Sequence, residues 1–299
     1  MHEYQALRAK HDFLTLAHTP DLICEVTELP IKAFGFDAAI LFSDILLILE
    51  ALGCSVRFDE GKGPLIDGDS LQLREVEQSL SFVYQAISSL KKSLQVPLIG
   101  FAGAPFTVAS YFVEKAGSPT LTNTKKRLLQ DPEGFQKIIE TITEGTILHL
   151  NAQIAAGCDV VQIFDSWAMY LAPHQFATYV IKPLAVILKA LKPCPVILFC
   201  RGGAAFYEPL GALEAQGLSF DWQVDLQEMR QRLPHSCLQG NLDPAVLLTD
   251  PKTIEREAKR LLMSMRDDPG FIFNLGHGVL KETPRQNVQA LVDCVKSYG

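Results

Sequence analysis

Short apolar runs alternate with longer helical stretches along almost the whole of this 299-residue chain. Seven of the runs have the length of β-strands, and the first of them, residues 39–42, has no polar face, which is typical of a parallel strand buried on both sides. They cover residues 39–42, 96–101, 159–164, 195–200, 218–222, 237–241 and 271–275. A helix or loop separates each run from the next, and the expected helices include residues 72–94, 173–191 and 251–265. This alternation predicts right-handed crossovers and a parallel sheet.

The number of these units predicts an α/β fold of the (β/α)8 TIM-barrel type. The alternative is a doubly wound sheet, but no GxGxxG motif follows the first strand. Seven strands are one fewer than a closed barrel needs, so the first strand of the barrel is apparently missing from this sequence. No linker, low-complexity segment or charge block interrupts the pattern. We therefore expect a single domain over residues 1–299.

Composition excludes several classes of partner. The formal net charge of −7 argues against a nucleic-acid partner and requires locally placed cations for any anionic substrate. The apolar runs are too short to span a membrane, and residues 1–14 lack the apolar core of a signal peptide, so we expect a cytoplasmic protein. The seven cysteines form no CxxC pair. The segment His235-Ser236-Cys237 has a His-x-Cys spacing, but without further thiols at useful spacing we expect no metal site.

Polar residues follow most of the predicted strands, at the end where barrels of this type place their chemistry. The stretch FDAAILFSDIL (36–46) is the clearest case, because Asp44 follows a buried apolar run, although Ser43 or Asp44 could instead cap the next helix. The other candidates are Tyr111 beyond the Gly103-Ala104-Pro105 turn, Ser166, Arg201, Asp221, Asn241 with Asp243, and His277. Their recurrence at successive strand ends predicts a ligand site there.

Two glycine-containing segments allow a functional and a structural interpretation. His277 lies between Gly276 and Gly278, so its backbone can approach a ligand closely; the alternative is a histidine tied to the backbone of a tight turn. The segment Glu60-Gly61-Lys62-Gly63-Pro64 lacks the spacing and the Ser/Thr of a P-loop. We interpret it as a turn within an irregular piece, residues 56–69, with ligand contact as the alternative.

Several long motifs resemble the uroporphyrinogen decarboxylases, a family of the haem pathway. FDAAILFSDIL, EGKGP, PLIGFAGAPFTVASYFVE, LQGNLDP and FNLGHG occur in the family's order and span almost the whole chain. The resemblance implies a single-domain (β/α)8 barrel, cytoplasmic and usually a homodimer. It also implies a lyase of porphyrin biosynthesis that decarboxylates the four acetate side chains of uroporphyrinogen III to give coproporphyrinogen III, with no metal or organic cofactor.

The resemblance also assigns roles to single residues. The family's catalytic aspartate falls on Asp44, where it binds the pyrrole N–H groups of the tetrapyrrole substrate and stabilises positive charge as the ring is protonated. A pyrrole protonated on carbon is an electron sink, which is how decarboxylation can proceed without a cofactor. The family's other substrate contacts fall on Arg8, Tyr111, Ser166 and His277.

Three departures from the family pattern bear on activity. The arginine-rich motif RQAGRY, which grips the substrate carboxylates and includes a candidate proton donor, is absent ahead of Met1, together with the strand that leads into it. A late start codon, a shortened chain or lost activity would each account for this. We expect little decarboxylase activity from these 299 residues alone, because scattered lysines do not replace guanidinium clamps. Equal turnover by an upstream-extended chain would contradict this. Leu49 replaces a usual proline, and Arg201 replaces a common lysine and keeps its charge.

Two other functions are compatible with parts of the sequence. The first is a zinc-dependent corrinoid or thiol methyltransferase of a related branch, which holds zinc with His-x-Cys and a distant cysteine. In this sequence Cys200 lacks the preceding histidine, and the last strand carries His277 instead. The second is a non-catalytic porphyrinogen-binding protein that keeps the pocket without the arginines.

Overall fold

The computed structural model describes residues 1–59 and 63–298 and confirms the parallel α/β sheet. Its seven strands are β1 Ala39–Ile40, β4 Leu98–Gly103, β5 Val160–Asp165, β6 Val196–Cys200, β7 Gly217–Ser219, β8 Cys237–Leu242 and β9 Phe271–Leu275. They pair in that order, and every neighbouring pair is parallel. Because the order never reverses along the sheet, the sheet is of the barrel type, whereas a doubly wound sheet has a switch point.

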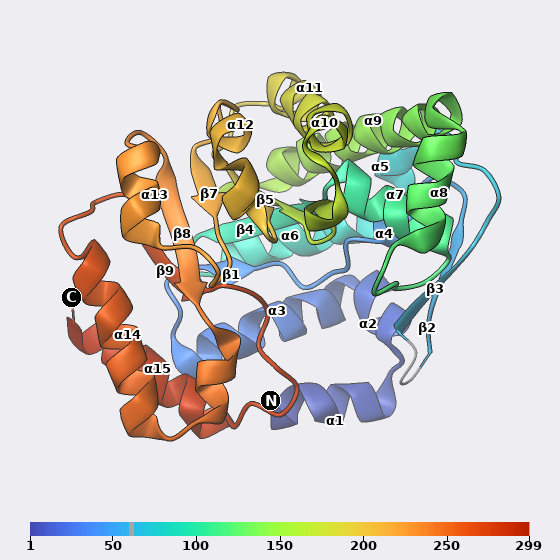
Figure 1. Ribbon diagram of the computed structural model, residues 1–299. Helices are drawn as coiled ribbons and strands as arrows, with labels where there is room; N and C mark the ends of the chain where they lie inside the picture. Colours follow the sequence, from blue (N-terminus) through green and yellow to red (C-terminus); the bar gives the residue numbers. More distant parts are fainter. Residues whose placement is uncertain (60–62, 299) are drawn as a thin grey trace.

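Helices surround this sheet, which lies in the interior of the molecule (Figure 1). Those of the first half are α1 His2–Lys10, α2 Phe13–His18, α3 Pro20–Phe34, α4 Leu47–Ala51, α5 Val76–Ser79, α6 Ser81–Ser93, α7 Pro105–Glu114, α8 Thr122–Gln130 and α9 Pro132–Ala156. Those of the second half are α10 Pro173–Phe176, α11 Lys182–Ala190, α12 Tyr207–Gly211, α13 Leu226–Arg232, α14 Pro251–Met265 and α15 Arg285–Tyr298, with short turns η1 Ala168–Tyr170, η2 Ala177–Ile181, η3 Gly203–Phe206 and η4 Pro244–Leu248.

Local sequence signals set several helix ends. Helix α3 begins at Pro20, where a missing N–H costs no helical bond, and ends at Gly35, which adopts φ 66°. The Asp250 side chain caps α14 by accepting hydrogen bonds from two backbone N–H groups of its first turn. Leu49 is fully buried within α4 and its N–H donates to the Leu46 carbonyl, a bond that a proline could not make.

The last helix, α15, contacts two segments of the N-terminal part of the chain. Lys296 Nζ of α15 donates to the Gly35 carbonyl at 2.5 Å, and Arg285 forms an ion pair with Glu3 at 2.8 Å. The edge strands, however, keep apolar side chains in solvent, since Ile40 of β1 is 47% exposed and Ile272 of β9 is 42% exposed. Within residues 1–59 and 63–298 no strand pairing joins β1 to β9. The sheet therefore has the seven strands that were expected. Its edge strands β1 and β9 do not pair with each other, so the barrel-type sheet stays open between them.

The segment from 56 to 69 was predicted wrongly as irregular. It forms most of an antiparallel hairpin, β2 Ser55–Asp59 with β3 Gly63–Asp67, whose register pairs Val56 with Ile66. Residues 60–62 of the glycine-lysine-glycine segment lie outside the described residues. A second difference is that the helix expected over 72–94 is divided into α5 and α6.

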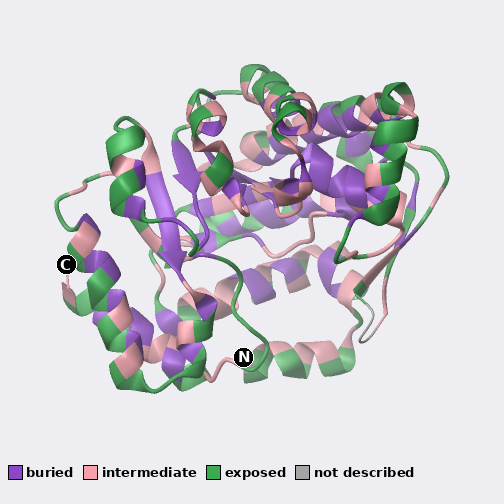
Figure 2. Cartoon of the chain, viewed as in Figure 1, coloured by how far each residue is buried: buried purple, intermediate pink, exposed green. Residues whose placement is uncertain are grey.

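The hydrophobic core runs through the sheet and the inner faces of the helices. All five residues of β6 are buried, as a strand covered on both sides requires. Figure 2 shows the same contrast between the buried strands and α1, none of whose residues is buried. In the part of the chain that the structure describes, no helix is both long enough and apolar enough to cross a membrane.

Candidate active site at the carboxyl end of the sheet

Asp44 lies just beyond β1 and holds its own turn. Its Oδ1 accepts a hydrogen bond from the Leu46 N–H at 2.8 Å, whereas the N-cap position of α4 is Leu46 itself. The alternative that Ser43 or Asp44 caps the next helix is therefore wrong for α4. The Asp44 carboxylate does, however, fix the backbone at Leu46 through this hydrogen bond. Desolvation raises the pKa of Asp44 to about 6. The hydrogen bond from the Leu46 N–H lowers this pKa, and the negative charge of Glu50 raises it further. A carboxylate in this state is stabilised by any cation placed beside it.

The Gly103-Ala104-Pro105 turn lets α7 begin directly against the Asp44 segment. A Cβ on Gly103 would lie 3.0 Å from Ile45 Cβ, so the absence of a side chain permits this close approach. Helix α7 then carries the half-buried Tyr111. Burial raises the pKa of Tyr111, the nearby Asp44 charge raises it further, and the Trp167 side chain lowers it. The Asp44 charge thus acts on Tyr111, and a shared role of the two residues in ligand binding stays a prediction.

Ser166 follows β5 between two residues that the sequence analysis did not select. Asp165 is 2% exposed and its Oδ1 accepts a hydrogen bond from Thr107 Oγ1 at 2.5 Å; Thr107 Oγ1 in turn accepts one from the Trp167 N–H at 3.1 Å. Burial raises the pKa of Asp165 to about 6, although Thr107 and two backbone N–H groups oppose the rise. The signal for Asp165 was its place at the end of VVQIFD, the same pattern that identified Asp44.

Replacing Thr107 tests whether this buried bond holds the β5 turn. Thr107→Val keeps the shape but removes both hydrogen bonds, and we expect it to lower the free energy of unfolding by about 2–3 kcal/mol, because a buried carboxyl loses a partner. Thr107→Ser keeps the hydroxyl and should cost about 1 kcal/mol or less, mainly through the lost methyl group. Urea denaturation midpoints measure both. Equal losses in the two variants would contradict the assignment.

His277 follows β9 and is fixed by its own backbone. Its Nδ1 accepts a hydrogen bond from the Gly278 N–H at 2.7 Å, so the neutral ring carries its proton on Nε2, where it can donate to a ligand. Although the residue is exposed overall, partial burial of the ring lowers its pKa, the Arg201 charge lowers it further, and Asp221 opposes both. The structural interpretation of His277 is therefore confirmed, since one ring nitrogen is tied to the turn. Contact of the other ring nitrogen with a ligand stays a prediction.

Aromatic rings from three adjacent strands form a row that ends at His277. Phe101 of β4 contacts Phe164 of β5 at 5.8 Å between ring centroids, Phe164 contacts Phe199 of β6 at 5.9 Å, and Phe199 contacts the His277 ring at 5.7 Å. No local sequence pattern indicates this row, because each ring appears singly in its strand. A row of ring edges and faces suits a large, flat, largely apolar ligand.

The remaining strand-end residues divide into structural ones and one cation. Asp221 accepts hydrogen bonds from the Gly202 and Gln223 N–H groups, Asn241 donates to the Asp221 and Val224 carbonyls, and Asp243 caps the η4 turn. Arg201 lies at the end of β6, where its N–H donates to the Asp165 carbonyl. Its charge acts on His277.

Arg8 lies on α1, next to aromatic rings that lead toward the Asp44 segment. Its guanidinium carbon is 5.9 Å from the Phe13 ring centroid, and Phe13 contacts Phe42, two residues before Asp44. Its Nη1 donates to the His11 carbonyl. Within the described chain no ion pair joins Arg8 to Asp44. The Asp44 charge acts on Tyr111, and the Tyr111 ring contacts Trp167 in the turn that contains Ser166.

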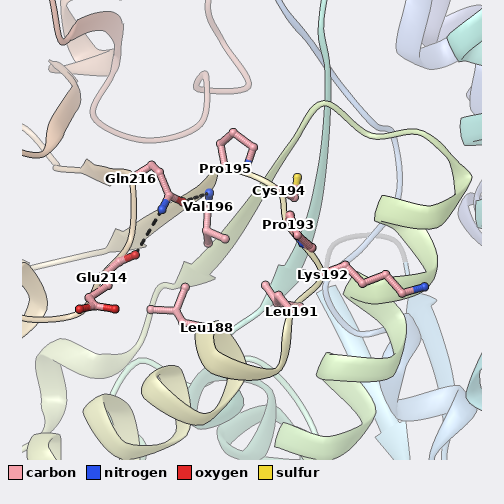
Figure 3. A pocket seen from close by; sticks show the side chains of 9 residues that line it. All are labelled: Leu188, Leu191, Lys192, Pro193, Cys194, Pro195, Val196, Glu214 and Gln216. Atoms are coloured by element: carbon pink, nitrogen blue, oxygen red, sulfur yellow. Dashed lines mark hydrogen bonds between the residues drawn. The ribbon is translucent and has the colours of Figure 1, made fainter.

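Features at the opposite end of the sheet carry no comparable chemistry. A surface pocket at the amino-terminal end of β6 is lined by residues that include Cys194, Val196 and Gln216 (Figure 3). The Gln216 side chain bonds the Val196 N–H there, which is a structural role. Cys237 likewise begins β8, away from the candidate site. Among the described residues no group of three or more His, Cys, Asp or Glu side chains could hold a metal ion.

Comparisons with known proteins identify the family to which this chain is similar. The family model described as "Uroporphyrinogen decarboxylase (URO-D)" matches residues 1–298. A uroporphyrinogen decarboxylase of Protochlamydia amoebophila is 44% identical, over 98% of this chain and 83% of that protein. One of Vesicomyosocius okutanii is 40% identical over 99% of this chain and 90% of that protein.

Solved structures support the fold. A methyltransferase from Methanosarcina mazei superposes with a TM-score of 0.82 at 21% identity, over 95% of this chain and 87% of that one. A B12-independent methionine synthase from a Shewanella species gives a TM-score of 0.64 at 11% identity, over 93% and 88% of the two chains. At these identities the similarity concerns the fold alone, and it confirms the barrel-type architecture.

Proposed function

Because the chain belongs to the uroporphyrinogen decarboxylase family, we propose that it decarboxylates the four acetate side chains of uroporphyrinogen III to give coproporphyrinogen III. The observation that carries this proposal is Asp44, a desolvated carboxylate at the carboxyl end of β1 beside Tyr111. A fixed negative charge in such surroundings favours a developing cation, and the cation here is the pyrrole ring protonated on carbon.

Each decarboxylation balances without an added electron acceptor. A proton adds to the pyrrole α-carbon next to the ring carbon that bears the acetate group, which places positive charge on the ring. The bond between the acetate methylene and its carboxylate then breaks, its electron pair forms an exocyclic double bond to the ring carbon, and CO2 leaves. Protonation of this exocyclic methylene gives a methyl group, and loss of the proton first added to the α-carbon restores the aromatic pyrrole. Asp44 contributes most while the ring is cationic, because its charge is already in place and needs no reorganisation.

The surroundings of Asp44 support a tetrapyrrole substrate. The Phe101, Phe164 and Phe199 rings offer an apolar row for a macrocycle. At the end of that row, His277 Nε2 and the Arg201 guanidinium can meet carboxylates on the macrocycle's edge, with Tyr111 and Ser166 as further polar contacts. Arg8 would join them from the rim, as the family resemblance implies.

An anaerobic assay with uroporphyrinogen III tests the proposal. The 299-residue chain is assayed beside a version extended upstream with the family's arginine-rich segment, and the products are oxidised to porphyrins and separated by chromatography. Loss of one, two, three and four carboxyl groups in at least one of the two forms supports the proposal. Recovery of uroporphyrin alone from both forms, with the protein folded, would overturn it.

The two other functions have distinct signatures in the same experiment. Tight coproporphyrinogen binding with no turnover in either form would identify a porphyrinogen-binding protein. Stoichiometric zinc in the purified protein would favour the methyltransferase, because that reaction needs a metal held by thiolates. The family resemblance also supports a cytoplasmic homodimer, and analytical ultracentrifugation at micromolar concentration tests the dimer.

A further inference from the structure

Two buried polar atoms without hydrogen-bond partners lie on either side of Ser166. They are Asp165 Oδ2 and the indole Nε1 of Trp167. An unmade hydrogen bond at a buried group costs about 1–3 kcal/mol, so such atoms are few in folded proteins and each needs a reason. Here they lie in one turn, at the carboxyl end of β5, where the candidate site is.

The Trp167 indole is held against Tyr111. The two rings contact edge to face, with centroids 5.7 Å apart and planes at 73°, and on its other side the indole contacts Tyr170 at 6.0 Å. The Trp167 side chain lowers the pKa of Tyr111 as a hydrogen-bond partner of its hydroxyl, and the Asp44 charge raises it. The indole N–H is nevertheless outside good hydrogen-bond geometry from every acceptor among the described residues, so its interaction with the Tyr111 hydroxyl is at most weak.

The backbone around Trp167 is fixed before any ligand arrives. Its N–H donates to Thr107 Oγ1 and its carbonyl accepts from the Tyr170 N–H at 3.1 Å. Asp165 is bonded to the same Thr107 hydroxyl and is buried below the turn, so its carboxyl holds the turn. Trp167 is the member of this pair whose ring contacts Tyr111, and its N–H makes no hydrogen bond of good geometry among the described residues.

An unused indole N–H requires an acceptor, and the porphyrinogen of the proposed function carries carboxylates on every pyrrole. An N–H aimed at a carboxylate makes a charge-assisted hydrogen bond without adding charge of its own. On the premise of that proposed function, we propose that Trp167 is a substrate-binding residue: its Nε1–H donates to a side-chain carboxylate of the porphyrinogen, and its ring positions the Tyr111 phenol beside the same group.

Calorimetric titration with coproporphyrinogen III, kept reduced under argon, measures this bond without requiring turnover. Trp167→Phe keeps a ring against Tyr111 and Tyr170 but removes the donor, and it should weaken binding about tenfold, the effect of losing one hydrogen bond to a charged group. Trp167→His restores a ring N–H. Its binding of coproporphyrinogen III should therefore be weaker than that of wild type by no more than about threefold, which is half of the tenfold loss on a logarithmic scale. Tyr170→Phe is the control, because it removes a hydroxyl bonded to the Pro119 carbonyl outside the site.

A spectroscopic readout separates ligand contact from a purely structural role. The chain has two tryptophans, so Trp222→Phe leaves Trp167 as the only one. Its emission should change on addition of coproporphyrinogen III, with the midpoint found by calorimetry. Tm values within about 2 °C of wild type in all variants would show that the fold is intact.

The outcomes separate this proposal from the proposed function. If the wild-type chain and its upstream-extended form both fail to bind coproporphyrinogen III, both proposals fall. If wild type binds and Trp167→Phe binds equally well, or weakens no more than Tyr170→Phe, only the assignment of Trp167 is overturned. An unchanged Trp167 emission at saturating ligand would overturn it as well.

Discussion

Asp44→Asn is expected to lower kcat/KM for uroporphyrinogen III by about 10²–10³-fold, the usual effect of removing one preorganised electrostatic partner of the transition state. The amide oxygen can still accept the Leu46 N–H bond, so the turn after β1 is kept while the negative charge is lost. The measurement uses the more active of the 299-residue and upstream-extended forms. A variant that keeps more than a tenth of wild-type activity would contradict the role of Asp44.

The same variant should be more stable than wild type at neutral pH. Because the folded-state pKa of Asp44 is raised to about 6 from 3.8, the native state binds this proton more tightly than the unfolded state. The free energy of unfolding therefore falls as pH rises from about 4 to about 6, and it stays lower above that window. Asp44→Asn removes this loss of unfolding free energy. One pKa unit corresponds to about 1.4 kcal/mol, so the gain in stability is at most about 3 kcal/mol.

Thermal denaturation between pH 4 and pH 8 measures the effect. The Tm of Asp44→Asn should exceed that of wild type by several degrees at pH 7.5, and the gap should narrow toward pH 4. Asp250→Asn is the matched control. Asp250 caps α14 on the surface and its pKa is lowered by Thr253, so its replacement should leave activity unchanged and bring no gain in Tm. A Tm gap for Asp44→Asn that is independent of pH would contradict the desolvated carboxylate.

Gly276→Ala should lower the free energy of unfolding by about 2–4 kcal/mol, the range for a side chain forced into a packed site. The added Cβ would lie 2.6 Å from the Trp222 backbone nitrogen and 3.1 Å from two backbone carbons of Asp221. These are backbone atoms, so no side-chain rotation relieves the clash. The Gly276 N–H also donates to the Leu242 carbonyl at 2.7 Å, which ties the end of β9 to β8.

Gly278→Ala, two residues away, provides the control. Its Cβ would meet nothing within 4 Å, so its stability should stay within about 0.5 kcal/mol of wild type. Both variants leave the His277 side chain in place, but only Gly276→Ala displaces the segment that holds it. Coproporphyrinogen binding should therefore weaken in Gly276→Ala alone. Equal losses of stability in the two variants would show that the close contact at Gly276 is unimportant.

Buried strands were the most predictable part of this chain. The apolar run 195–200 matches β6, and α14 coincides with the predicted 251–265, because full burial and helix caps leave strong local patterns. The hairpin of β2 and β3 was missed, because its partly exposed strands mix charged and apolar residues beside a glycine-rich segment. The π-helical turn η2 within the predicted helix 173–191 has no signature that a periodicity argument detects.

The site was predictable wherever a strand end determines it. Asp44 and His277 were identified because they directly follow apolar runs, and the parallel sheet brings those ends to one side. Thr107 and Asp165 are 58 residues apart, so their hydrogen bond depends on how α7 packs against β5, which no local pattern encodes. Trp167 was read as part of the β5 end, but its unpartnered indole N–H became visible only from the packing of Tyr111 and Tyr170 around it.

The most direct test of the central claim is the product pattern from uroporphyrinogen III under anaerobic conditions. We predict stepwise accumulation of species with seven, six, five and finally four carboxyl groups, ending in coproporphyrinogen III, by the 299-residue chain or its upstream-extended form, and loss of this series in the matching Asp44→Asn variant. Undiminished uroporphyrinogen with both forms folded, or an identical product series from wild type and Asp44→Asn, would contradict it.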